Sequence, residues 1–129
     1  MSFRKDNKTE RVERLKWDAL CEANWELIER IGLPLSAIEI HTRFQYFLMH
    51  GSMYPYEDWS GFSVTQLRRD EPERYELLML LLDRYFEAGF EDPGLGPFSN
   101  AEKLRLAKKY PKQFPLWQIE ASDENLDQR

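Results

Sequence analysis

The chain has 129 residues and a mass of 15.5 kDa, with 18 basic residues, 23 acidic residues and a formal net charge of -5. This length fits one domain that buries roughly two-thirds of its surface on folding, and hydrophobic residues, at 42% of the chain, supply a core. The composition excludes an intrinsically disordered chain, a collagen-like fibre and a disulfide-stapled scaffold.

The sequence carries no sign of a membrane or secretory protein. Its longest apolar run covers residues 77–82, whereas about 20 apolar residues are needed to span a bilayer. The charged N-terminus lacks the apolar segment of a secretory signal, and the single cysteine, Cys21, suits a reducing compartment. We therefore expect a cytoplasmic protein that does not contact a membrane.

Helix start and stop signals divide the chain into four main helices and one short helix. In chain order, the pattern predicts helices over residues 8–31, 37–50, 64–69, 71–88 and 100–110. Capping boxes are expected at Ser36–Glu39, Ser63–Gln66 and Ser99–Glu102, and Asn7–Glu10 and Asp70–Glu73 have the same spacing. Glycines follow three of the helices, at positions 32, 51 and 89. The predicted fold class is all-α, a compact single-domain bundle.

Apolar positions predict which helix faces are buried. In the helix over 8–31 the expected buried face consists of Val12, Leu15, Ala19, Leu20, Ala23, Leu27 and Ile31, and Trp25 falls on the opposite, charged face. The helix over 71–88 is apolar over more than half its circumference, so we expect it at the centre of the bundle. The bundle domain is expected to cover residues 1–119, in which 114–119 is ambiguous, and residues 120–129 form an acidic tail.

Neither a metal nor a cofactor site is expected. His41 and His50 are nine residues apart on one predicted helix, which places them on opposite sides of its axis. Cys21 has no partner at zinc-ligand spacing. His41 lies on an apolar face, so a hydrogen-bonded core or interface histidine is expected, and His50 fits a cation at a helix C-terminus.

Catalytic signals are equally weak. Glu76, Asp83 and Glu87 share one arc of the helix over 71–88, and paired carboxylates can divide acid and base roles. A solvated polar face is the simpler interpretation. Neither Cys21 nor any serine lies in a nucleophile motif, so the sequence favours a protein that is not an enzyme.

A basic run near the C-terminus raises the alternative of nucleic-acid binding. Residues 103–112 carry five basic side chains and no acidic one. Against this, the net charge is negative, and Asp70, Glu71 and Glu73 stand at the start of the helix that would enter a DNA groove. A solvated face that could pair with the acidic tail is expected instead.

The segment over 54–62 is the most informative stretch. It contains Tyr54, Tyr56, Trp59 and Phe62 beside the acidic residues Glu57 and Asp58. Tyrosine and tryptophan give large contact areas at low entropic cost, which is typical of a recognition surface. A lid that covers one end of the bundle is the other interpretation, slightly favoured, and both can hold.

The leading hypothesis is a non-enzymatic protein that binds another protein, or a second copy of itself, through aromatic anchors. The anchors are Trp25, Tyr54, Tyr56, Trp59 and Trp117, with Glu57 and Asp58 setting orientation and charge selectivity. The alternative is a small enzyme or ligand-binding bundle with a pocket near His41, Tyr46, the 54–62 segment and a carboxylate of the helix over 71–88. Nucleic-acid binding through residues 103–112 is the third hypothesis.

Overall fold

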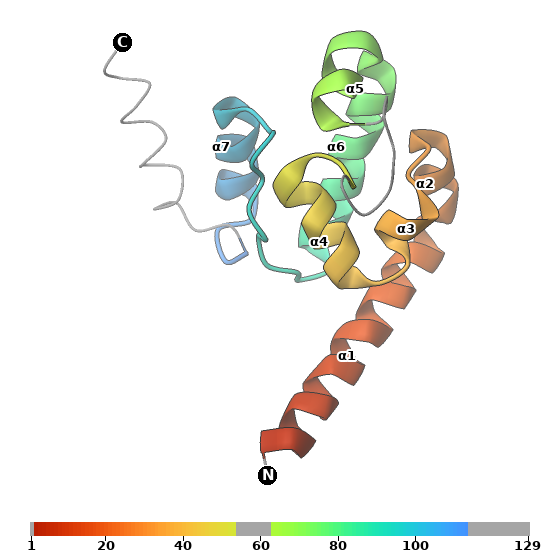
Figure 1. Ribbon diagram of the computed structural model, residues 1–129. Coiled ribbons are helices and arrows are strands. Elements are labelled where there is room, and N and C mark those ends of the chain that lie inside the picture. The colour runs from red at the N-terminus through yellow and green to blue at the C-terminus, as the bar shows by residue number, and fades with distance from the viewer. Residues whose placement is uncertain (1, 54–62, 114–129) are drawn as a thin grey trace.

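The computed structural model describes residues 2–53 and 63–113, and this part of the chain is all-α, as predicted (Figure 1). Its helices are α1 Ser2–Ala23, α2 Trp25–Ile31, α3 Leu35–Ile38, α4 His41–His50, α5 Val64–Asp70, α6 Pro72–Glu87 and α7 Asn100–Lys109. None of these helices is both long and apolar enough to cross a membrane. Residues 54–62 and 114–129, which include the aromatic segment and the acidic tail, lie outside the described residues.

Local capping signals explain the best-predicted helices. Ser99 and Glu102 form the predicted box at the start of α7: the Ser99 hydroxyl accepts from the Glu102 amide at 3.3 Å, and the Glu102 carboxylate accepts from the Ser99 amide at 3.0 Å. Ser63 caps α5 by accepting from the Gln66 amide at 3.1 Å. Gly32 and Gly51 follow α2 and α4 with φ angles of 80° and 82°, a backbone that favours glycine.

The helix predicted over 8–31 is longer and is divided at Asn24. It begins at Ser2, so Asn7 lies inside α1 and its predicted cap is wrong. At Asn24 the backbone leaves the helical region, with φ -119° and ψ 23°. The Asn24 side-chain amide donates to the Leu20 carbonyl at 2.9 Å. A side chain that bonds to the nearby backbone in this way competes with helix continuation.

The helix predicted over 37–50 is also divided. Its first turn is α3, which follows Pro34, so Ser36 lies inside this helix and the predicted Ser36–Glu39 box is wrong. Ile40 is extended, with φ -140° and ψ 155°, and precedes α4. The Ile38 carbonyl at the end of α3 accepts a hydrogen bond from the Trp17 indole at 3.0 Å. This long-range bond, which no local pattern contains, ties α3 to α1.

The remaining predicted cap, Asp70–Glu73, is also wrong. Glu71 precedes α6, and its side chain makes no capping bond, while Pro72 occupies the first turn. Proline fits there because the first-turn amides have no partner within the helix. The start of α6 is therefore set by proline rather than by an aspartate cap.

The core is built on α6, which packs against α2 and α5. Its buried residues are Tyr75, Leu78, Leu81, Leu82, Tyr85 and Phe86. An aromatic cluster continues from Tyr85 to Trp17, Phe44 and Phe90, with the Tyr85 and Phe90 rings stacked at 4.7 Å. The predicted central position of this helix agrees with the packing.

The predicted buried face of the first helix is wrong over most of α1. Val12 and Leu15 are 55% and 58% exposed, and Ala19 and Ala23 are exposed as well. The helix packs on the body through Trp17 and Leu20, whose side chains are buried. Its N-terminal part extends away from the other helices (Figure 1), so no other described element covers the apolar residues there.

Candidate functional site: an acidic cleft beside His41

A cleft lies between α1, the start of α4 and the segment over 89–92. Its volume is about 760 Å³. Its apolar wall consists of Trp17, Ile40 and Phe90, of which Ile40 is exposed. A cleft of this size is in the range of small-molecule and peptide-side-chain sites.

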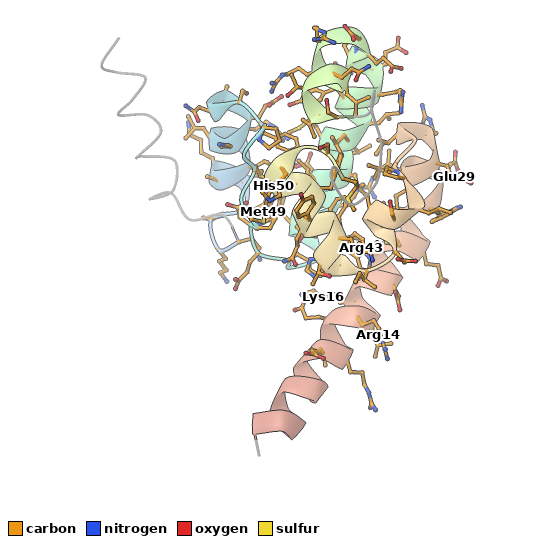
Figure 2. The ribbon with its side chains drawn as sticks, in the orientation of Figure 1. Arg14, Lys16, Glu29, Arg43, Met49 and His50 are labelled. Atoms are coloured by element: carbon orange, nitrogen blue, oxygen red, sulfur yellow. The ribbon has the colours of Figure 1, made fainter. Side chains whose placement is uncertain are left out.

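Carboxylates dominate the rim of the cleft. The acidic lining residues are Glu10, Glu13, Asp18, Glu39, Glu91 and Asp92, and Arg14 is the cation that lines it. Lys16 and Arg43 approach two of them, with Lys16 Nζ 3.9 Å from Glu13 and Arg43 Nη1 3.7 Å from Glu39. Arg14 and Lys16 point to different sides of α1 (Figure 2). Carboxylates still outnumber cations at the cleft when all three cations are included.

Asp92 is a partly buried carboxylate of the rim. Burial raises the pKa of its carboxyl group, while the hydrogen bond from the Gly94 amide and the charge of Lys103 act in the opposite direction. That hydrogen bond is 2.8 Å long. The Asp92 amide also donates to the Gln113 carbonyl at 2.9 Å. These bonds fix the loop that closes one side of the cleft.

His41 forms the polar part of the wall. Its Nε2 lies 2.6 Å from the Tyr85 hydroxyl, and its Nδ1 lies 3.6 Å from Glu13 Oε2. Burial lowers the pKa of His41, and Glu13 acts against this effect. A neutral imidazole with its proton on Nδ1, toward Glu13, accepts the Tyr85 proton at Nε2. The predicted hydrogen bond of His41 is therefore found, on a partly buried side chain at the cleft wall rather than in the core.

Burial limits the chemistry that His41 and Tyr85 can perform. Tyr85 is completely buried, so its hydroxyl does not reach the cleft, and the same hydroxyl occupies Nε2 of His41. Among the residues from 2 to 53 and from 63 to 113, no group of three or more His, Cys, Asp or Glu side chains is placed to hold a metal ion. The accessible chemistry is negative charge beside apolar surface.

Of the predicted anchors, only Trp25 lies within the described residues. It is the first residue of α2 and is 42% exposed, and it does not line the cleft. Tyr54, Tyr56, Glu57, Asp58, Trp59 and Trp117 lie outside that part of the chain. A pocket near His41 was predicted as the alternative, but its acidic lining from α1 and the segment over 89–92 was not, because these segments are far apart in the sequence.

The alternative pocket predicted near His41 has a different composition. Tyr46 packs on His50, with ring centroids 4.3 Å apart, and does not line the cleft. None of the lining carboxylates comes from α6. The α6 residue Asp83 instead faces α7, where it approaches Arg105 at 3.4 Å and Lys109 at 3.7 Å. Two of the five residues of the basic run are thus paired within the bundle.

Comparison with models of protein families, with curated proteins and with solved structures finds nothing that matches the chain.

Proposed function

We propose that the protein is a non-enzymatic, cytoplasmic binding protein whose acidic cleft takes a positively charged segment of a partner protein. The segment would present lysine or arginine to the carboxylates and an apolar side chain to Ile40. The observation that carries this proposal is the excess of carboxylates around an apolar wall in one cleft. A small polar rim around an apolar centre is the usual design of a recognition site.

Four carboxylates at the rim of the cleft are accessible to a partner. Glu10, Asp18, Glu39 and Glu91 are exposed, so they keep their water in the free protein and attract a basic segment over a distance of about 10 Å at moderate salt. Such charges raise the association rate and exclude acidic partners.

The apolar wall supplies the second half of the proposed recognition. Trp17 and Phe90 are held by the core, and the chain's own Lys16 lies over the Phe90 ring with Nζ 4.4 Å from its centroid. Lys16 does not line the cleft, but its contact indicates that the Phe90 ring can accept a cation, an arrangement that is favourable by about 0.5–1 kcal/mol at an exposed site. Trp25, the aromatic residues of 54–62 and Trp117 remain proposed anchors for the same partner.

Selection from a displayed library of random peptides tests the proposal. We expect the wild-type protein to enrich peptides that combine lysine or arginine with an apolar residue. In the double variant Glu39→Lys, Glu91→Lys, the affinity of a synthetic selected peptide should fall by about tenfold or more. The measurement is isothermal titration at low and moderate salt.

The matched control is the double variant Glu73→Lys, Glu76→Lys, which makes the same change of charge on exposed positions of α6, away from the cleft. It should change the affinity by no more than about twofold. Equal weakening by both double variants would mean that the peptides respond only to net charge. A selection without basic peptides would also contradict the proposal.

A further inference from the structure

The exposed face of α1 is a second surface, separate from the cleft. The α1 stripe consists of Val12, Leu15, Ala19 and Ala23, which are all exposed. Their spacing of three to four residues places them on one side of the helix, away from the buried Trp17 and Leu20. The cleft is lined by other residues of α1, such as Glu13 and Trp17. A protein that covers the stripe therefore leaves the cleft open.

The shape of the stripe suits a helix that runs in the opposite direction. It has large side chains, Val12 and Leu15, toward its N-terminal end and alanines at its C-terminal end. Two antiparallel copies of α1 that cross near Trp17 would place Leu15 of each opposite Ala19 of the other, and Val12 opposite Ala23. A large side chain then meets a small one at every level, which allows close packing of the helices.

Charge along α1 selects the same orientation. Residues 10–16 contain three basic and two acidic residues, whereas residues 17–23 contain two acidic residues and no basic one. Parallel copies would place like charges together. Antiparallel copies place the positive half of each α1 beside the negative half of the other, which favours the pair electrostatically.

A specific ion pair follows from helix geometry. Arg11 and Glu22 are both exposed, and their separation of eleven positions corresponds to about three turns, so they lie on the same flank of the stripe. In a two-fold antiparallel pair, same-flank residues face each other. Arg11 of each copy thus meets Glu22 of the other, once on either side of the two-fold axis.

From this complementarity of shape and charge we infer that the occupant of the α1 stripe is a second copy of the chain, bound antiparallel along α1. The helix has 22 residues and is about 33 Å long, and its N-terminal part is free of the body (Figure 1). One helix pair is a small interface, so the dimer forms at micromolar concentrations. This inference does not depend on the proposed function of the cleft.

Sedimentation velocity over protein concentrations from about 1 to 300 µM tests the inference, because a small interface of this kind should dissociate within that range. The wild-type mass should rise from 15.5 kDa toward twice that value. Leu15→Glu should remove the dimer over the whole range. The matched control, Leu80→Glu, changes an exposed leucine of α6 and should leave the dimer intact. A wild-type monomer at every concentration, or equal behaviour of the two variants, would overturn the inference.

A charge exchange tests the orientation. Arg11→Glu and Glu22→Arg should each weaken the dimer by about tenfold, because each produces two repulsive contacts, and the double variant should return to within about threefold of the wild type. Retained helix content by circular dichroism separates loss of the dimer from loss of folding. A double variant as weak as the single ones would exclude this antiparallel pairing.

Discussion

His41 and Tyr85 are joined by a hydrogen bond of 2.6 Å between the imidazole Nε2 and the phenol oxygen. This bond links the first residue of α4 to the last turn of α6, across 44 positions of sequence. Burial lowers the pKa of His41 and raises the pKa of Tyr85. Both shifts favour the neutral pair, in which the tyrosine donates and the histidine accepts.

Stability should therefore depend on pH through His41. In the unfolded chain a histidine has a pKa of about 6.5, and in the folded protein the pKa of His41 is lower. The unfolded state therefore binds a proton first as the pH falls. The stabilisation from neutral His41 is complete above pH ~6.5 and is lost below it, until the folded protein also binds the proton.

Urea unfolding between pH 5 and 8 measures this effect. The free-energy difference between the wild type and His41→Gln should be largest at pH 8 and should shrink toward pH 5. His50→Gln, at the exposed C-terminal end of α4, is the matched control for removal of a histidine. Parallel pH curves for the wild type and His41→Gln would refute the role of His41.

Two tyrosines of α6 should respond differently to loss of the hydroxyl. Tyr85→Phe leaves the partly buried Nε2 of His41 without its donor and should lower the free energy of unfolding by about 1–3 kcal/mol. The Tyr75 hydroxyl is also buried, but it has no hydrogen-bond partner among the described residues, so Tyr75→Phe should cost less. Chemical denaturation of both variants at pH 7 makes the comparison, and the reverse ranking would be the contrary result.

Substitution of Trp17 should reduce stability much more than substitution of Trp25, because the first lies in the core and the second on the surface. Trp17 is 3% exposed and donates to the Ile38 carbonyl, so Trp17→Phe loses packing and a hydrogen bond and should cost about 2–4 kcal/mol. Trp25 is exposed at the start of α2, and Trp25→Phe should change stability by no more than about 0.5 kcal/mol. Thermal unfolding measures both. A large loss for Trp25→Phe would argue against Trp25 as a free anchor.

Asp83 should weaken any attraction of the basic run for polyanions. It accepts a hydrogen bond from the Tyr110 hydroxyl at 3.1 Å and approaches Arg105 and Lys109. Burial, together with this carboxylate, raises the pKa of Tyr110 to about 12. We expect the wild type to elute from heparin at low salt, and Asp83→Asn to elute later because two cations are released.

The matched control for this charge change is Glu76→Gln, which removes an exposed carboxylate from the same helix. It should elute close to the wild type. Strong, salt-sensitive retention of the wild type would revive the hypothesis of nucleic-acid binding through residues 103–112.

The sequence predicted the elements whose limits depend on neighbouring residues. The start of α7 follows from Ser99 and Glu102, which bond to each other across one turn, and the stop at Gly51 follows from its left-handed backbone. Such signals act within a few residues, so they can be read without knowledge of the fold. The central position of α6 followed in the same way from its wide apolar surface.

Long-range contacts determined two features that the capping and apolar patterns did not predict. The division between α3 and α4 accompanies the bond from Trp17 to Ile38, and the exposure of Val12 and Leu15 results from the direction in which α1 leaves the body. An apolar face marks a surface that can be buried, but it does not say which element, or which molecule, buries it.

By itself, the amino-acid sequence determined the all-α class, the starts of α5 and α7 and the helix at the centre of the core, because each depends on local hydrogen bonds or on the period of apolar residues. Only the tertiary structure decided that Glu13, His41 and Asp92 meet at one cleft. These residues come from three separate segments, and the packing of Trp17, Tyr85 and Phe90 holds those segments together. Their proximity is therefore a property of the packed core rather than of any local pattern.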